Sequence, residues 1–325
     1  MYFCAHFQTI MQVYKEQDKY DVRNPVVTVG VFDGVHRGHQ HILKTMVDYS
    51  KKVNGESVIL TFWPHPRIFL ANDQYAIKLL NTLEEKKGLL DKAGIDHLII
   101  LTFTRRISNM SACEFIKKIL VNKIRVRHLL VGADNQFGKD KMDDFKAIRS
   151  CSDKFGIEVK QLELKVVEEE KISSTKIRDA LWNGDVRLAN RLLGYDFFFR
   201  GRIVTGKKIG RKMGFPTANI FSDETYKLIP KVGVYAVEVV LGDNKYGGML
   251  NIGFRPTVNH TGEPPSVEVN IFDFDKEIYG QKATLLFKDR IRDEKKFDNI
   301  ELLVKQLERD KISAMEILKK RDKIN

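Results

Sequence analysis

The stretch 26–43, VVTVGVFDGVHRGHQHIL, constrains the fold of this chain more than any other. Residues 26–31 form a short, β-branched apolar run, which is typical of a buried parallel strand, and a helical pattern covers 40–50. His36 and His39 therefore lie in a strand-to-helix turn and in the first turn of the helix. Unpaired backbone N–H groups and the positive end of the helix dipole make such a turn suited to an anion.

Within this turn, Gly38 leaves room for a phosphate or a nucleobase against the backbone. Two imidazoles can donate hydrogen bonds to phosphoryl oxygens as negative charge builds up. An isolated H-x-G-H is equally compatible with two surface histidines in a turn. The strand before it and the helix after it favour a phosphate site, because structural context decides what a short motif means.

A regular alternation of apolar runs and helical patterns extends from this turn to residue 162. Such alternation is typical of an α/β fold with a parallel, doubly wound sheet of the Rossmann type. Thr82 and Ser111 stand where helices should begin, and Glu114 completes a capping box with Ser111. The predicted strands are 26–31, 57–62, 97–102, 128–131 and 157–162, and the further predicted helices are 82–93, 111–122 and 145–155.

Three more segments of this region are predicted to face a ligand. Residues 63–66, Trp-Pro-His-Pro, form a rigid, non-helical loop at the C-terminal end of a strand, where open α/β sheets bind ligands. Residues 132–141 place an acid between glycines after the fourth strand. Ser174, Thr175 and Arg178 can present two hydroxyls and a guanidinium to a triphosphate. The first segment is also compatible with a stiff connector, and the third with a helix cap.

The pattern changes near residues 195–199 to short alternating strands with Gly and Pro turns. Strands without helices between them predict a small antiparallel barrel, and a lysine-rich amphipathic helix from about Asp298 is predicted to pack on it. We therefore expect two domains, 1–194 and 195–325, as suits a chain of 325 residues. The predicted strands of the barrel are 201–204, 233–241, 247–252, 266–272 and 282–287.

Two clusters in the second domain indicate phosphate and metal chemistry. Residues 206–215 are Gly-rich and basic, compatible with a flexible hairpin or with a flap over phosphates. Thr217 and Asn219 follow, and in an extended chain their side chains face the same side. Hydroxyl and amide oxygens are hard ligands suited to Mg²⁺. Glu268 alternates with apolar neighbours, which by itself is the pattern of a surface carboxylate.

These motifs resemble those of the bacterial bifunctional riboflavin kinase/FAD synthetases, which belong to the H-x-G-H nucleotidyltransferase superfamily. Three positions depart from the family pattern: Val31 replaces the usual Asn, Asn135 a frequent aromatic residue, and Lys141 a frequent arginine. The matching segments are G-x-F-D-G-x-H-x-G-H at 30–39, T-F-x-P-H-P at 61–66, G-x-D-x-x-F-G at 132–138, I-S-S-T-x-I-R at 172–178, G-F-P-T-A-N at 214–219, V-E-V at 267–269, and shorter matches at 251–257 and 292–297.

The resemblance implies an enzyme of flavin-cofactor biosynthesis with ATP as co-substrate. The second domain would phosphorylate riboflavin to FMN, and the first would adenylylate FMN to FAD and release pyrophosphate. His36, His39 and Arg178 would stabilise charge in the adenylyl step, and Glu268 would be the base of the kinase step. The implied Mg²⁺ ligands are Thr217 and Asn219, and the implied ATP- or flavin-binding residues are Gly30, Phe32, Asp33, Gly34, Gly38, His65, Asp134, Ser174, Thr175, Gly206, Lys207, Gly210, Gly214, Pro216 and Asn251.

Composition limits the class of protein. The formal charge of +12 allows nucleic acid, an anionic membrane or phosphorylated small molecules as partners. The basic residues are dispersed, no RNA-binding motif is present, and no apolar run reaches transmembrane length, so we expect no nucleic-acid or membrane partner. Cys4, Cys113 and Cys151 are far apart and predict neither a metal site nor a disulfide framework. We therefore expect a reducing, cytoplasmic location, supported by the lack of a signal-peptide pattern.

Two other functions are compatible with parts of this pattern. One is an adenylyltransferase for a different substrate, with a barrel used only for binding. The other is a flavin-binding or RNA-binding regulator with inactive sites. The G-F-P-T-A-N run at 214–219 with Glu268 argues against the first. The intact residues His36, His39, Thr217, Asn219 and Glu268 argue against the second. The oligomeric state stays open between a monomer and weak self-association.

Overall fold

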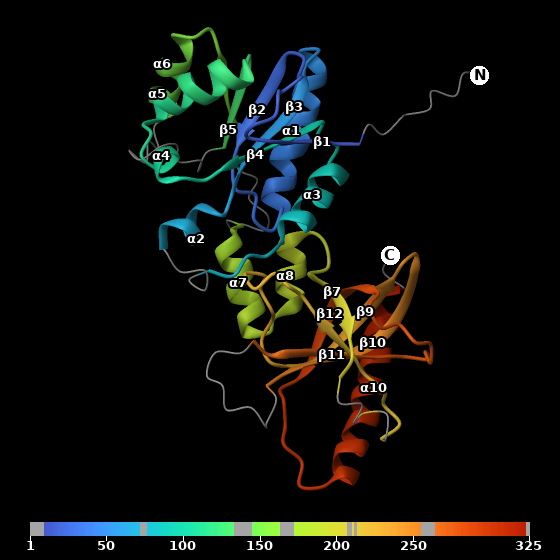
Figure 1. Cartoon of the computed structure of the whole chain (residues 1–325). Helices are drawn as coiled ribbons and strands as arrows, with labels where there is room; N and C mark the ends of the chain where they lie inside the picture. Colours follow the sequence, from blue (N-terminus) through green and yellow to red (C-terminus); the bar gives the residue numbers. More distant parts are fainter. Residues whose placement is uncertain are drawn as a thin grey trace, which may run out of the picture. The chain divides into compact units, whose positions relative to one another are not determined.

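The computed structural model describes residues 10–71, 77–132, 145–162, 172–206, 210, 213–254 and 264–322. By its internal contacts the chain divides into two compact units, Met1–Ser174 and Thr175–Asn325. Figure 1 shows the α/β architecture of the first unit and the barrel of the second. Among the described residues, no helix has both the length and the apolar character needed to cross a bilayer.

A six-stranded sheet with all neighbours parallel forms the centre of the first unit. Its strand order is β1-β4-β3-β2-β5-β6, so the order reverses direction between β2 and β5. The predicted doubly wound α/β fold is confirmed, and β1 at the edge is the one strand of this sheet that the sequence pattern did not indicate. The strands are β1 Gln12–Lys15, β2 Pro25–Val29, β3 Glu56–Trp63, β4 His97–Thr102, β5 His128–Gly132 and β6 Glu158–Leu162.

Helices cover both faces of this sheet because successive strand residues point to opposite sides. Val26 and Ile59 share one apolar cluster with residues of α1 and α3. Val27 and Val58 share another with residues of α5, the π-helix η1 and α6. The helices are α1 Arg37–Lys52, α2 Pro66–Ala71, α3 Leu83–Lys92, α4 Arg105–Ser108, α5 Ala112–Phe115, η1 Ile116–Ile124 and α6 Phe145–Asp153.

The local signals for helix starts hold in the structure. Thr82 and Ser111 each form a capping box, with Glu85 and Glu114 respectively. The predicted non-helical loop after β3 is wrong in its last position, because Pro66 begins the helix α2. Proline suits the first position of a helix, where its missing N–H would have no intrahelical partner.

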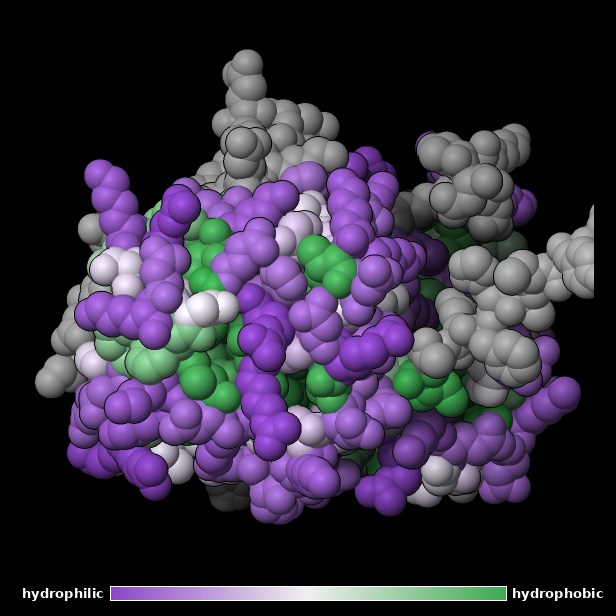
Figure 2. All heavy atoms as spheres, turned by 90° about the horizontal axis from the view of Figure 1, so that it is seen from above, coloured by the Kyte–Doolittle hydropathy of each residue, from purple (hydrophilic) through white to green (hydrophobic). Residues whose placement is uncertain are grey.

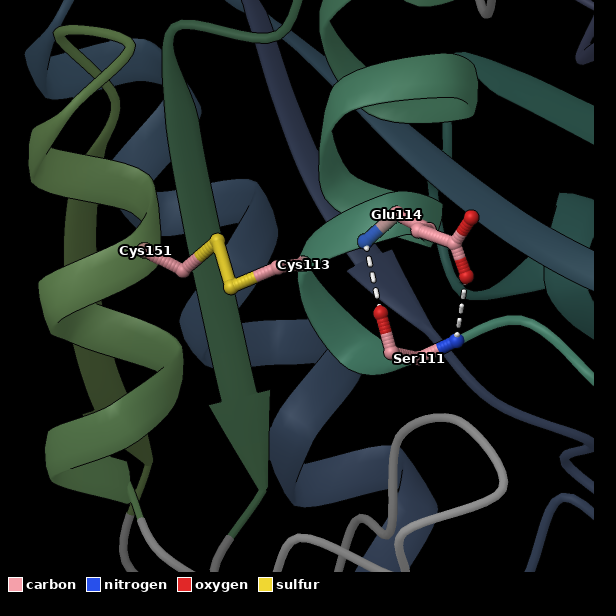
Figure 3. The surroundings of a disulfide bond; sticks show 4 residues. All are labelled: Ser111, Cys113, Glu114 and Cys151. Atoms are coloured by element: carbon pink, nitrogen blue, oxygen red, sulfur yellow. Dashed lines mark hydrogen bonds between the residues drawn. A yellow bond between two sulfur atoms is a disulfide. The ribbon is translucent and has the colours of Figure 1, made fainter.

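The expectation of unpaired cysteines is also wrong. Cys113 on α5 and Cys151 on α6 form a disulfide, with their Cα atoms 5.7 Å apart (Figure 3). The two residues are separated by 38 positions in sequence. The pairing results from tertiary structure, since α5 and α6 pack on the same face of the sheet, and no local sequence signal reports this.

In the second unit, six antiparallel strands close into a barrel in the order β10-β11-β8-β7-β12-β9. The predicted barrel and C-terminal helix are confirmed. Helix α10, Ile300–Asp322, packs on the barrel through Ala314. Asp310 accepts one bifurcated hydrogen bond from Arg292 Nε and another from Nη2. The strands are β7 Phe198–Val204, β8 Ala218–Phe221, β9 Gly233–Leu241, β10 Asn244–Gly253, β11 Ser266–Ile271 and β12 Lys282–Arg292.

Two helices precede the barrel, α7 Ser174–Asn183 and α8 Val186–Leu193. Hydrogen bonds join both helices to the barrel unit. Lys231 N donates to Leu181 O at 3.0 Å, and Asn190 Nδ2 donates to Phe287 O at 2.8 Å. The structural division therefore falls after Ser174, whereas the sequence pattern placed the boundary after residue 194.

The face of the molecule seen in Figure 2 is predominantly hydrophilic, and its hydrophobic residues form separate small areas. This agrees with the prediction that the dispersed basic residues belong to a solvated surface. Several of them lie next to acids, as in the Lys87–Glu84 and Lys118–Glu114 ion pairs at 2.6 and 3.0 Å.

Candidate active sites

The histidine turn, residues 30–39, connects β2 to α1 at the reversal point of the strand order. His36 is the N-cap of α1, and its Nδ1 accepts a hydrogen bond from the backbone N–H of His39 at 3.3 Å. The two imidazoles stack with ring centroids 3.6 Å apart and an interplanar angle of 14°. Because His36 Nδ1 is an acceptor, its ring proton lies on Nε2. The cap thus orients both rings at a helix N-terminus.

Burial keeps His39 uncharged near neutral pH. The pKa of His39 lies well below its usual 6.5, first because burial disfavours the charged form, then because of His36 and Lys86 nearby. His39 Nδ1 is buried without a hydrogen-bond partner among the described residues. A buried polar atom of this kind is costly unless a ligand satisfies it.

Glycines shape the histidine turn. Gly34 has a φ of +84°, in the left-handed region that glycine adopts without strain. A Cβ at Gly38 would lie 3.3 Å from Cε1 and Nδ1 of His36. The space that Gly38 provides is therefore taken by the His36 ring, whereas the sequence interpretation assigned it to a ligand.

Asp33 links the histidine turn to two other predicted segments. Its buried carboxylate accepts a hydrogen bond from Leu80 N at 2.9 Å, just before α3. Its carbonyl oxygen accepts one from Ser174 Oγ at 2.8 Å. Ser174, in the I-S-S-T-x-I-R segment, is thus hydrogen-bonded to the histidine turn. Thr175 and the buried Arg178 of the same segment belong to the second unit.

His65 has a structural contact of its own. The residue is buried after β3, and its Nδ1 accepts a hydrogen bond from Arg67 N at 3.0 Å. The predicted positions Asp134 and Lys207, and the departures Asn135 and Lys141, lie outside the described residues.

The second site is a row of polar side chains across three neighbouring strands of the barrel, which we call the Glu268 row. Glu268 on β11 is paired in register with Asn219 on β8 and with Asn251 on β10. Cross-strand partners point to the same face, so these three side chains form a line. Thr217 Oγ1 lies 3.5 Å from Glu268 Oε2.

Glycines bring backbone close to this row. A Cβ at Gly206 would overlap the side-chain amide of Asn219, and one at Gly210 would overlap the carbonyl oxygen of Phe215. Gly214 has a φ of +77° and lies before Pro216, whose carbonyl accepts a hydrogen bond from Asn270 Nδ2 at 2.7 Å.

The Glu268 row offers a hydroxyl, an amide and a carboxylate oxygen within one small area. Such oxygens suit Mg²⁺, which retains several waters and binds substrate phosphates. Among the described residues no group of three or more His, Cys, Asp or Glu side chains could hold a metal ion. Glu268 and the neutral oxygens beside it fit an ion that would arrive with the phosphates of ATP.

Two residues near these sites escaped the sequence interpretation. A Cβ at Gly253 would overlap the carboxylate of Glu294, which places that acid beside Asn251. Lys86 on α3 is buried near the histidine turn, although its acidic and basic neighbours in sequence suggested a solvated helix. A signal for Glu294 existed in the match at 292–297, whereas none existed for Lys86.

The fold is that of a two-unit protein, with the histidine turn in a parallel α/β unit and the Glu268 row in a closed antiparallel barrel. Two family models match in the same order: FAD synthetase over residues 18–176, and riboflavin kinase over residues 193–318. Bifunctional riboflavin kinase/FMN adenylyltransferases are 37% identical in Bacillus subtilis, over 89% of this chain and 91% of the relative, and 36% identical in Escherichia coli, over 90% and 92%. This chain therefore belongs to the bifunctional riboflavin kinase/FMN adenylyltransferase family.

A solved structure from Streptococcus pneumoniae shares the whole architecture. Its TM-score is 0.83 at 32% identity, over 94% of this chain and 99% of that one. That protein is described as a macrolide-efflux protein, which differs from both matched family models and from the curated relatives.

Proposed function

We propose that the two units divide two reactions between them. The barrel unit transfers the γ-phosphoryl group of ATP to riboflavin, giving FMN and ADP. The α/β unit then joins FMN to the AMP part of ATP, giving FAD and pyrophosphate. The observation that carries this proposal is the separate gathering of the two motif sets, at the histidine turn and at the Glu268 row.

In the adenylyl step, a phosphate oxygen of FMN attacks the α-phosphorus of ATP, and the bond from that phosphorus to the β-phosphate breaks. The imidazoles of His36 and His39 donate hydrogen bonds to the α-phosphate oxygens as charge develops there. Ser174, Thr175 and Arg178 bind the leaving pyrophosphate. No covalent enzyme intermediate is needed, since positioning and charge stabilisation account for the catalysis.

In the kinase step, Glu268 accepts the proton of the ribityl 5′-hydroxyl as its oxygen attacks the γ-phosphorus of ATP. Thr217 and Asn219 would hold Mg²⁺ beside Glu268, and this ion would supply positive charge to the phosphates. The backbone at Gly206 approaches Asn219 closely, and amides beside such a glycine could bind the phosphates. A cytoplasmic location is part of this proposal, because both steps consume ATP.

The test uses the purified full-length chain and two variants, each expected to lose one of the two reactions and to keep the other. Wild-type protein with riboflavin, ATP and Mg²⁺ should form FMN and then FAD, separated by chromatography. Glu268→Gln should make neither product from riboflavin but should make FAD when FMN is supplied. His39→Gln should stop at FMN. FAD formation from riboflavin at the wild-type rate by either variant would contradict the assignment of that residue.

A further inference from the structure

Phe32 is a buried aromatic residue of the histidine turn with an unfavourable backbone conformation. It is 5% exposed, and its φ is +50°. The left-handed region is uncommon for residues other than glycine, and for a bulky side chain it is an outlier. Glycine or asparagine would adopt this conformation with less strain, so the backbone alone does not account for a phenylalanine here. The contacts of its ring therefore need an explanation.

The phenyl ring of Phe32 contacts the imidazole of His39. The two ring centroids lie 5.1 Å apart with an interplanar angle of 60°. This separation is within the range of about 4.5 to 7 Å that is typical of interacting aromatic pairs. His39 also stacks on His36, with centroids 3.6 Å apart. The three rings form a continuous series of contacts, in which the imidazole of His39 is the middle member.

Close packing determines the position of the Phe32 ring. A Cβ at Gly30 would lie 2.8 Å from Cε2 and 3.2 Å from Cδ2 of that ring, so only glycine leaves the space that the ring occupies. Phe32 also belongs to the apolar cluster that contains Val35, Leu43 and Met46. A ring confined by packed neighbours is a rigid surface, and it restricts the orientations open to a side chain that contacts it.

We propose that Phe32 is a positioning residue for FAD formation, whose ring fixes the orientation of the His39 imidazole and shields it from water. This inference rests on the proposed function, in which His39 donates a hydrogen bond to a phosphate oxygen of ATP. Phe32 acts through His39 and not by contact with the substrates, because its burial leaves the ring little surface for a ligand.

The environment of His39 agrees with this role. Its Nδ1 is buried, whereas the residue as a whole is partly exposed. Its pKa lies well below 6.5, first because burial disfavours the charged form and then because of His36 and Lys86. An apolar ring in contact with the imidazole contributes to that burial. Loss of the phenyl ring should admit water to His39 and raise its pKa.

The experiment compares Phe32→Leu and Gly30→Ala in the full-length chain. The first removes the ring, and the second keeps it but forces it to move. Each should lower kcat for FAD formation from supplied FMN about 10- to 100-fold, the scale of a misplaced catalytic group, while KM for FMN and ATP stays within about twofold. Riboflavin phosphorylation should also stay within about twofold.

The matched control is Phe115→Leu. Phe115 is buried to a similar extent, at 4% exposed, but it belongs to the apolar cluster on the opposite face of the sheet. This variant should lose stability as Phe32→Leu does, measured by thermal melts, and yet form FAD within about twofold of the wild-type rate.

NMR of labelled histidine supplies a readout that loss of packing alone would not change. The ring current of Phe32 shifts the carbon-bound imidazole protons of His39. Phe32→Leu should abolish that shift and raise the pKa of His39 toward 6.5, and Gly30→Ala should alter the shift. Phe115→Leu should leave the His39 resonances and their titration as in the wild type.

Unchanged kcat or unchanged His39 resonances in folded Phe32→Leu would overturn the proposal. So would a raised KM for FMN or ATP at an unchanged kcat, because Phe32 would then contact a substrate. If Phe32→Leu does not fold, as judged by circular dichroism, Gly30→Ala decides by the same measurements. A wild-type chain that forms no FAD would instead contradict the proposed function, and the His39 resonances would still show whether Phe32 orients this imidazole.

Discussion

Two histidines at the start of one helix are held as a stacked pair, and burial keeps the second uncharged near neutral pH. A neutral imidazole already carries one N–H group, so it can donate a hydrogen bond to a phosphoryl oxygen without first binding another proton. Replacement by glutamine removes the ring stack while keeping a polar side chain. We expect His39→Gln to lower kcat for FAD formation from supplied FMN about 10²-fold, the effect of losing one charge-stabilising donor. Riboflavin phosphorylation by the same variant is the internal control.

The pH dependence of FAD formation follows from the direction of this pKa shift. Because burial holds the pKa of His39 well below 6.5, the neutral form persists as the pH falls through 6.5. FAD formation by the wild type should therefore stay level as the pH falls from neutral past 6.5 and decline only at lower pH. A decline centred on 6.5 in a kcat profile with saturating FMN would mean that His39 titrates as an ordinary exposed histidine.

Glu268 is the only carboxylate in the row that it forms with Asn219 and Asn251. Glutamine has nearly the same shape but cannot accept the proton of a substrate hydroxyl. Glu268→Gln should therefore slow FMN formation by about 10²- to 10⁴-fold, the usual contribution of a positioned general base. A thermal melt within a few degrees of the wild type would show that the fold is retained. Full riboflavin phosphorylation by this variant would exclude the role.

At the scale of elements, the backbone at Gly206, just after β7, depends on glycine for its close approach to the Glu268 row. In Gly206→Ala the new methyl group would overlap the Asn219 amide, so one of the two must move. We expect FMN formation to fall about tenfold or more, because displacement of a binding group by about 1 Å can cost that much. FAD formation from FMN should persist. The control is Gly88→Ala on α3, where nothing lies within 4 Å of the added methyl group.

The disulfide joins α5 and α6 on the sheet face opposite the cluster that contains Phe32 and Val35 of the histidine turn. Reduction should lower the free energy of unfolding of the first unit by up to about 4 kcal/mol, from the closure entropy of a 38-residue loop. Denaturation with and without dithiothreitol measures this, and Cys113→Ala should be insensitive to the reductant. FAD formation should be equal in both forms, since the two cysteines are remote from the turn.

The sequence could predict those features that depend on residues close together in the chain, and not those that depend on residues far apart in it. Capping boxes at Thr82 and Ser111 and the alternation of strands and helices are local, and they were predicted. The pairing of Cys113 with Cys151 and the burial of Lys86 depend on which elements pack together on each face of the sheet. The Glu268 row could be predicted only in part. Motif matches identified its residues, but the register of the strands, which brings them together, was not predictable from the sequence.

At the scale of the whole molecule, the boundary between the two units depends on which unit the helices α7 and α8 belong to. The family models leave residues 177–192 unassigned, whereas the contacts assign them to the barrel unit. Asn190 joins α8 to the barrel unit by three hydrogen bonds. It donates to Asp196 Oδ1 and to Phe287 O and accepts from Phe197 N, at 2.7 to 3.0 Å. Leu193 of α8 is fully buried.

Two fragments that differ only in these helices test the division of labour. The fragment 175–325 keeps Asn190 and its partners, so it should fold, phosphorylate riboflavin with ATP and Mg²⁺, and make no FAD, because it lacks His36 and His39. The fragment 196–325 loses the hydrogen bonds of Asn190, and water replaces this partner where the groups become exposed, at a cost of about 0.5 to 1.5 kcal/mol for each hydrogen bond. It should make FMN but melt at a lower temperature, measured by circular dichroism alongside both product assays. A folded 175–325 fragment without kinase activity would mean that the first unit completes the kinase site, and equal melting temperatures would mean that the barrel is independent of α7 and α8.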